Sequence, residues 1–301
     1  MHIRNDDWFY ARNTLARDGW ESIVDSSTHG WKYTGVRVAE LVAGKSVEFA
    51  AENLERIILP LSGSFEISYV LHDGTTASQS LIGRKDVFHG PTDTLYLPIR
   101  TSARISGNGR VAVAEAVAHE IFPVAYLPRE SVAIEMRGAG NATRQIHNFG
   151  TPANLAASRI IACEVINPAG NWSSYPPHKH DENKPGVESV LEEIYYFEVA
   201  VDRNTVVHGD VDPIGYVRNY GSSAGDIDTL AEVRTGDIVL VPYGWHGPCV
   251  APPGYDLYYL NVMAGPDPER TWLITDDPAH GWVRESWKNQ EIDPRLPYTR
   301  D

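Results

Sequence analysis

The chain consists largely of short runs of β-branched and aromatic residues separated by turn-forming residues, and this pattern limits the folds open to it. Such runs lie at residues 35–41, 56–61, 64–71, 94–97, 111–116, 159–166, 194–199, 238–241 and 257–262. Tight-turn signals separate many of them: Ser62-Gly63-Ser64, His72-Asp73-Gly74, Ser106-Gly107-Asn108-Gly109 and Thr235-Gly236-Asp237. Long amphipathic helix patterns are absent from the sequence. The spacing predicts an all-β protein made of sandwiches or barrels.

Two pairs of segments resemble each other, which predicts an internal duplication. Residues 54–58 (Leu-Glu-Arg-Ile-Ile) resemble 191–195 (Leu-Glu-Glu-Ile-Tyr), and residues 93–98 (Asp-Thr-Leu-Tyr-Leu-Pro) resemble 237–242 (Asp-Ile-Val-Leu-Val-Pro). At 301 residues the chain has room for two ordinary domains. We place the boundary near Gly150, with one barrel in residues 1–150 and a second barrel plus a tail in residues 151–301.

Charge and composition exclude several classes of partner. The chain has 26 Lys plus Arg against 40 Asp plus Glu, a net charge of −14, which opposes binding to nucleic acid or to an anionic membrane. A small anionic substrate remains compatible, because a local Arg or Lys in a cleft acts within the ~10 Å over which salt screens the general field. Cys163 and Cys249 are too few for a disulfide framework, and we expect both to be buried.

The sequence also bears on location and assembly. The chain has no signal-peptide pattern after Met1 and no run near the ~20 apolar residues of a membrane span, so we expect a cytoplasmic protein. The sequence is compatible with a homo-oligomer and does not determine the oligomeric state.

Four residues in strand-like context form a candidate metal site. His178 and His180 are two apart, so in an extended segment both imidazoles leave the same face. Glu193 begins a later strand, with Glu192 as its competitor for the carboxylate role, and His246 follows a Pro-Tyr-Gly turn at the end of another strand. Imidazole-rich sites suit zinc, manganese, iron, nickel or cobalt better than calcium or magnesium. A bare pair of histidines is more often part of an exposed loop than of a metal site, but the ordered set of four residues favours a metal.

These motifs resemble those of the cupin superfamily, and the chain is similar within it to the bicupin uronate isomerases, especially those of inositol catabolism. The closer resemblance is carried by segments at residues 90–93, 137–145, 177–181, 191–196 and 259–266. It implies two double-stranded β-barrels, with the metal ligands His178, His180, Glu193 and His246 in the second. The spacing departs from the usual second cupin motif, because only Trp245 separates Gly244 from His246.

The first barrel lacks the ligand residue types. Arg56 stands where Glu193 stands in the second barrel, Leu41 and Ala43 fall near the positions of the two histidines, and Ser102 falls near that of His246. We therefore expect residues 1–150 to form a degenerate barrel without a metal, with a structural or dimer-forming role.

The resemblance also implies an activity, the conversion of 5-deoxy-D-glucuronate to 2-deoxy-5-keto-D-gluconate in myo-inositol catabolism without an organic cofactor. In such an aldose–ketose isomerisation a divalent ion stabilises the enediolate, and a base moves the proton between adjacent carbons. Candidates for the acid–base role are Glu192, Tyr195 and Tyr243, with Tyr196 and Lys184 also conceivable. Arg144, Arg218 and Lys184 are candidates for binding the substrate carboxylate. We also expect residues 137–144 to form an interdomain loop over the site, and the tail to cap a barrel without a chemical role.

Three other functions stay open at this point. Three histidines and a glutamate also suit an iron-dependent cupin dioxygenase. A non-catalytic sugar-binding bicupin would use the same fold without turnover, and a related ketol-isomerase of pectin catabolism would use the same chemistry on another uronate.

Overall fold

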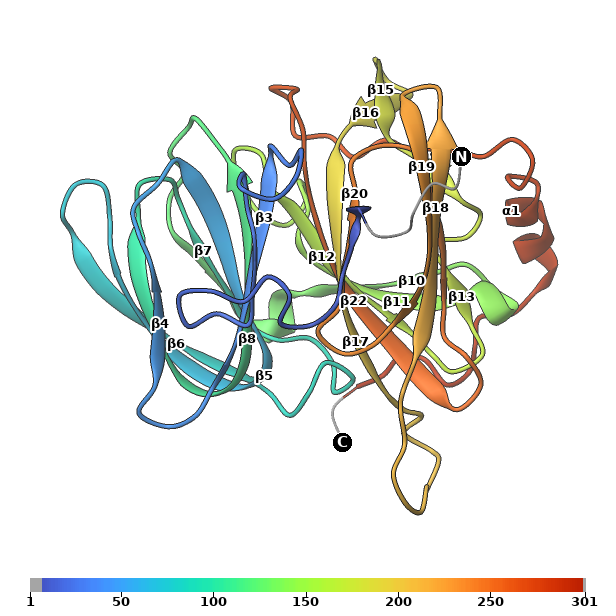
Figure 1. Cartoon of the computed structure of the whole chain (residues 1–301), viewed down its shortest axis with the longest axis horizontal. Helices are drawn as coiled ribbons and strands as arrows, with labels where there is room; N and C mark the ends of the chain where they lie inside the picture. Colours follow the sequence, from blue (N-terminus) through green and yellow to red (C-terminus); the bar gives the residue numbers. More distant parts are fainter. Residues whose placement is uncertain (1–6, 300–301) are drawn as a thin grey trace.

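The computed structural model describes residues 7–299 and is built mainly of antiparallel β-strands. Figure 1 shows two β-barrels side by side, the first formed by the early strands and the second by the late ones. This confirms the predicted all-β, two-barrel architecture. Within residues 7–299 no helix has the length and apolar character that crossing a lipid bilayer requires.

The first barrel is one sheet of eight strands that is curled on itself. Its order is β2-β3-β8-β5-β7-β9, with β4 paired to β8 and β6 paired to β5. The strands are β2 (Ser22–Val24), β3 (Thr34–Leu41), β4 (Ser46–Phe49), β5 (Leu54–Val70), β6 (Thr76–Arg84), β7 (Thr94–Leu97), β8 (Ser102–Val117) and β9 (Ala125–Leu127). An apolar cluster that includes Ile58, Phe65 and Ile105 fills its interior.

The second barrel is formed by two facing sheets. The larger has the order β1-β20-β17-β22-β12-β11-β10, and the smaller has the order β19-β18-β21-β14-β23, with β13 paired to β21. The strands of the larger sheet are β1 (Phe9–Tyr10), β10 (Ala133–Arg137), β11 (Arg144–Gly150), β12 (Ile161–Asn167), β17 (Glu192–Val201), β20 (Ile238–Val241) and β22 (Tyr255–Ala264). Those of the smaller are β13 (Trp172–Ser173), β14 (His178–Lys179), β18 (Gly215–Ser222), β19 (Gly225–Val233), β21 (Trp245–Val250) and β23 (Thr275–Asp276).

Short elements complete the second barrel. Strands β15 (Asp181–Lys184) and β16 (Glu188–Val190) form a separate hairpin. The helical elements are α1 (Val283–Ser286) and the 3-10 turns η2 (Arg129–Ser131), η3 (Gly140–Ala142) and η4 (Trp287–Asn289).

Alternation along β17 separates two cores. Tyr195 and Phe197 point into the second barrel, while Ile194 and Tyr196 point out of it and pack against the first barrel. Successive side chains of a strand leave opposite faces, so one strand lines the interior of its barrel and also the contact between the two barrels. Cys163 and Cys249 are free and buried, as predicted.

Two predicted turns are wrong, because a long two-stranded ribbon runs through both. The segment 62–64 lies within β5 and the segment 106–109 lies within β8, where Gly63 is paired with Gly109. Gly63 has φ +77°, and a Cβ added there would lie 1.9 Å from the Asn108 carbonyl oxygen. These glycines permit close backbone approach at an irregularity of the ribbon instead of ending the strands.

Strand pairing also divides the chain earlier than the predicted boundary near Gly150. Strands β10 and β11 (residues 133–150) pair with β12 of the second barrel, while β9 still pairs with β7 of the first. The chain therefore passes from β1, which pairs with β20 of the second barrel, into the first barrel, and it returns to the second barrel between β9 and β10. The segment 137–144, predicted to be an interdomain loop, is the connection between β10 and β11 at the second barrel.

Candidate metal centre

The predicted ligands converge inside the second barrel. One ligand atom each from His180, Glu193 and His246 lies within 4.8 Å of the others, and all three side chains are buried. The Glu193 Oε2 atom is 2.9 Å from His180 Nε2 and 3.3 Å from His246 Nε2. Ligands of one transition ion at ~2.1 Å lie about 3 to 3.5 Å from one another, so these separations suit a shared ion.

His178 lies at the edge of this cluster. Its ring centroid is 4.4 Å from that of His246 and 6.4 Å from that of His180. Strand pairing places His178 next to His246, because β14 is antiparallel to β21 and the two residues are directly opposite each other. Residues opposite each other in a ladder share a face, so the predicted fourth ligand stands beside the other three.

Backbone carbonyls orient the histidine rings. The Nδ1 atom of His180 is 2.9 Å from the Leu191 oxygen, and that of His246 is 3.1 Å from the Gly244 oxygen. His178 has a longer contact of 3.5 Å between Nδ1 and the Pro176 oxygen. Occupying Nδ1 in this way leaves Nε2 for an ion, which is the usual arrangement of metal-binding histidines.

The charges within the cluster depend on one another. Burial alone would raise the pKa of Glu193, but contact with His180 and His246 outweighs burial and holds that pKa below its ordinary range. Burial and then the rings of His246 and His180 lower the pKa of His178 well below its ordinary value. A neutral imidazole is the form that binds a metal.

An unpaired nitrogen in the cluster also fits a bound metal ion. His246 Nε2 is buried and has no hydrogen-bond partner among residues 7–299, since its 3.3 Å contact with Glu193 lacks hydrogen-bond geometry. A buried polar atom without a partner is costly unless something else satisfies it. A positive ion between this nitrogen and the carboxylate would do so.

A close backbone contact supports the strand that carries His246. Gly247 has φ +97°, and a Cβ there would lie 1.8 Å from the Ser174 carbonyl oxygen. Only glycine allows β21 to pass this close to the segment before His178.

The first barrel has a different arrangement at the equivalent place. Arg56 and Glu193 both lie opposite a residue that precedes a Pro, Leu97 in β7 and Val241 in β20. Arg56 is fully buried, and its Nε is 2.6 Å from Glu115 Oε1. A buried ion pair thus stands where the second barrel holds Glu193, the candidate ligand carboxylate.

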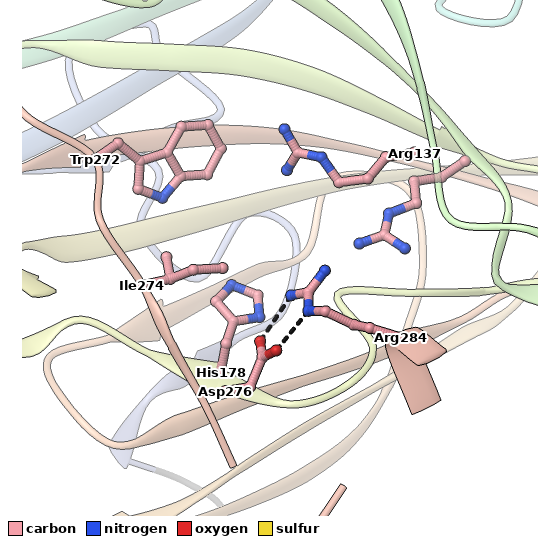
Figure 2. A pocket seen from close by; sticks show the side chains of 7 residues that line it. Arg137, His178, Trp272, Ile274, Asp276 and Arg284 are labelled. Atoms are coloured by element: carbon pink, nitrogen blue, oxygen red, sulfur yellow. Dashed lines mark hydrogen bonds and ion pairs between the residues drawn. The ribbon is translucent and has the colours of Figure 1, made fainter. Parts of the chain in front are cut away.

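A cavity of about 390 Å³ opens next to His178. Its remaining lining residues come from the β10–β11 region and from the tail: Arg137, Arg144, Trp272, Ile274, Asp276 and Arg284. Figure 2 shows His178 beside Asp276, whose carboxylate is paired with Arg284, with Trp272 and Arg137 on the other side of the space. A second, deeper cavity of about 30 Å³ shares Arg137, Arg144, His178 and Trp272 with the first, and its wall also includes Glu193, Tyr195 and Asn261.

The structure separates the predicted catalytic residues. Tyr195 lines the deeper cavity, with its ring centroid 6.3 Å from that of His246. Glu192 faces the first barrel, where its carboxylate accepts hydrogen bonds of 2.6 Å from the N–H groups of Tyr33 and Thr34. This corrects the catalytic prediction for Glu192: neighbouring residues in a strand point to opposite faces, and Glu193 takes the inner one.

Tyr243, Tyr196 and Lys184 also lie away from the cavity. The Tyr243 hydroxyl donates to the Asp226 carbonyl oxygen at 3.2 Å, near the surface. Tyr196 lies in the core between the barrels, and its hydroxyl donates to Glu198 at 3.0 Å. Lys184 is half exposed and is paired with Glu182 at 2.8 Å. Their predicted roles are therefore corrected, because hairpins and outward faces carry these side chains elsewhere.

Of the predicted carboxylate-binding residues, Arg144 lines the cavity and Arg218 does not. Arg144 is buried, and its Nη1 donates to the Ala142 carbonyl oxygen at 3.0 Å. Arg218 is paired with Asp228 on the outer face of β18 and stacks on Tyr220.

Several residues of the cavity wall had no predicted role, among them Arg137, Asn261, Trp272 and Arg284. Two of these had a signal: Arg137 lies in the segment 137–144 that was expected over the site, and Asn261 is a lone amide among the apolar residues 257–264. Trp272 and Arg284 had none, because their convergence depends on the path of the tail.

Comparison with known proteins agrees with the fold. The model of the KduI/IolB family matches residues 9–283. The 5-deoxy-glucuronate isomerase of Geobacillus thermodenitrificans is 38% identical over 87% of this chain and 90% of its own length. A solved IolB-like protein from Salmonella typhimurium superposes with a TM-score of 0.78 at 30% identity, covering 92% of this chain and 98% of the other. An oxalate decarboxylase of Lactobacillus farciminis, at 10% identity and a TM-score of 0.61 over 91% of this chain and 90% of its own, shares the fold.

Proposed function

The chain belongs to the KduI/IolB family and is an isomerase, and we propose that it converts 5-deoxy-D-glucuronate to 2-deoxy-5-keto-D-gluconate in inositol catabolism with one divalent transition metal. The observation that carries the proposal is the buried cluster of His180, Glu193 and His246, with His178 beside it, at the end of a cavity lined by arginines. Relatives named 5-deoxy-glucuronate isomerase support the choice of substrate.

His178, His180, Glu193 and His246 would hold the ion. When bound, it would act as a Lewis acid toward the oxygens of the adjacent carbons, where negative charge develops in an aldose–ketose isomerisation. The ring orientations fixed by the Leu191 and Gly244 carbonyls would keep the ligands in place between turnovers.

The interior around the cluster would exclude water and position the substrate. Ile146 and Val165 line the deep part of the cavity together with the buried aromatic rings of Tyr195 and Tyr259. The Tyr195 hydroxyl is 3.4 Å from the Ser174 hydroxyl, on the same face as Glu193. In the proposal Tyr195 acts on the reacting carbons as the acid–base group, and Arg144 binds the carboxylate of the substrate.

The test combines elemental analysis of the purified chain with isomerisation assays under anaerobic conditions. We expect one transition ion per chain and turnover of 5-deoxy-D-glucuronate. His246→Ala should lose both the ion and the activity, while His208→Ala, at an exposed loop position, should keep both. Retention of the ion and of full activity in His246→Ala would contradict the proposed centre.

Three other outcomes would reassign the function. Turnover of only the unsaturated-uronate product would indicate the ketol-isomerase of pectin catabolism. Oxygen uptake with no anaerobic turnover would indicate a dioxygenase. Tight sugar binding without any turnover, with the ion present, would indicate a binding protein.

A further inference from the structure

Three arginines from different parts of the chain line the cavity beside His178. Arg137 ends β10, Arg144 begins β11, and Arg284 lies in α1 of the tail. Two carboxylates line the two cavities, Asp276, which forms an ion pair with Arg284, and Glu193. Arg137 is paired with Glu135, which is outside the lining, at 2.8 Å. The lining residues of the cavity therefore carry an excess of positive charge in a chain whose net charge is −14.

Arg144 carries the uncompensated part of this charge. Among the described residues, its guanidinium contacts are the carbonyl oxygens of Ala142 and Tyr175 and the ring of Trp287, none of them an anion. Burial lowers the pKa of Arg144 to about 10, with Arg137 and Arg284 acting in the same direction, so the group stays charged near neutral pH. A buried charge without a counterion is costly, and an anionic ligand would relieve that cost.

Two buried N–H groups in the same wall also lack partners. Asn261 Nδ2 and Trp272 Nε1 are buried and have no hydrogen-bond acceptor among residues 7–299. Both residues line the deep part of the cavity, which also reaches Arg144, His178 and Glu193. Unpaired donors on the way from the arginines to the metal ligands call for a ligand rich in oxygen acceptors.

We propose that Arg144, Arg284 and Arg137 bind the carboxylate of the substrate and that Asn261 and Trp272 donate hydrogen bonds to its sugar oxygens. This rests on the proposed function and deepens it. In a uronate the carboxylate and the reacting aldehyde are at opposite ends of the carbon chain. Arg284 lines only the outer cavity and Glu193 only the deeper one, while Arg137, Arg144 and His178 line both. The tail from Trp272 to Arg284 is then part of the substrate site.

The test compares two probes that differ in charge, D-glucuronate and D-glucuronamide, by calorimetry with the metal-loaded protein. We expect the wild type to bind glucuronate at least about tenfold more tightly than the amide, the scale of one charge-assisted hydrogen bond. Equal affinity for the two probes in the wild type would overturn the proposal.

A double variant distinguishes loss of carboxylate binding from a disturbance of the local structure. Arg284→Gln alone leaves Asp276 as an unpaired anion, so the informative protein is the double variant Arg284→Gln/Asp276→Asn, which is neutral at both positions. We expect it to lose about tenfold in affinity for glucuronate, keep its affinity for the amide, and keep its metal content. Arg234→Gln, which breaks a surface pair with Asp212, is the matched control and should behave as wild type. Unchanged charge preference in the double variant would overturn the proposal.

Asn261→Leu tests the hydroxyl contact independently. The variant should bind both probes about tenfold more weakly, while its preference for glucuronate and its metal content remain unchanged. Unchanged affinity for the probes would remove Asn261 from the site.

Turnover of 5-deoxy-D-glucuronate by the same proteins distinguishes failure of the anion site from failure of the proposed function. If the protein turns over the substrate but binds the two probes equally, the proposed function stands and the anion site is rejected. If the wild type prefers glucuronate, the double variant loses that preference and no protein shows turnover, the anion site is supported and the proposed substrate is rejected.

Discussion

Glu55 and Glu192 hold equivalent positions in the two barrels, and each carboxylate accepts backbone hydrogen bonds from the segment that leads into a strand of the other barrel. Glu55 accepts from residues 158–160, before β12, at 2.5–2.8 Å. Glu192 accepts from residues 32–34, before and at the start of β3, at 2.6–3.3 Å. This reciprocal contact, which we call the glutamate clamp, gives the Glu of each repeat a structural role between the barrels.

The glutamate clamp should contribute to stability and not to metal binding. Glu192→Ala leaves the N–H groups of Tyr33 and Thr34 unpaired in a buried contact, so we expect a loss of about 3 kcal/mol in the free energy of unfolding. Chemical denaturation measures this loss, and elemental analysis should find the metal retained. Glu66→Ala, at an exposed position of β5, is the control and should change stability little. Loss of metal without loss of stability would instead favour a role for Glu192 at the centre.

A second contact between the barrels should make stability depend on pH. Arg84 of β6 forms an ion pair with Glu164 of β12, and Tyr258 donates to the same carboxylate at 2.6 Å. Burial alone would raise the pKa of Glu164, but Arg84 and His147 outweigh it and lower the pKa from 4.5 to about 2.

The lowered pKa of Glu164 in the folded state sets the direction in which stability changes with pH. A carboxylate whose folded-state pKa is depressed contributes stability fully above its unfolded value, near pH 4.5, and loses that contribution as pH falls toward 2. Glu164→Gln should therefore be less stable than wild type at pH 7, and the difference should shrink between pH 4.5 and pH 3. Denaturation curves at these pH values measure it, and a difference independent of pH would show that the charge of Glu164 is not the cause.

In the first barrel, removing one partner of the buried pair of Arg56 and Glu115 should lower the free energy of unfolding much more than replacing both partners by apolar residues. Glu115→Leu removes the buried partner of the fully buried Arg56 guanidinium, which keeps only the half-exposed Glu52 at 2.6 Å as an anion, and should cost about 3 kcal/mol of unfolding free energy. The double variant Arg56→Met/Glu115→Leu should recover much of that loss, because apolar side chains of similar size need no desolvation of charge. A double-mutant cycle measured by denaturation decides the point, and additive losses would contradict it.

Metal removal should destabilise the second barrel only when its ligands are intact. A chelator that strips the ion removes the stabilisation that a ligand gives to the folded state, so the wild-type melting temperature should fall. Glu193→Gln, which lacks the ligand carboxylate nearest His180 and His246, should melt at the same temperature with and without chelator. Calorimetry measures both, and a chelator effect of equal size in the variant would place the ion elsewhere.

The sequence alone determined the elements whose signals are local. Alternation and turn residues predicted β7 and β20 with the bounds that the structure has, and the paired repeats predicted two barrels. The spacing of His178 and His180 and the turn before His246 predicted residues that the structure brings together. In each case the signal comes from residues a few positions apart, and strand geometry translates such spacing directly into direction.

The tertiary structure alone decided what depends on which segments meet. Alternation requires Glu192 and Glu193 to point apart, but only the packing of the first barrel against β17 decides that Glu192 enters the clamp. Gly63 signalled a turn, yet its pairing with Gly109 made it part of a continuous strand. Arg137, Arg144 and Arg284 share a cavity because the tail crosses the end of the barrel and β23 pairs with β14. Such convergence arises from long-range contacts whose partners are far apart in the chain, and no local pattern in the sequence encodes them.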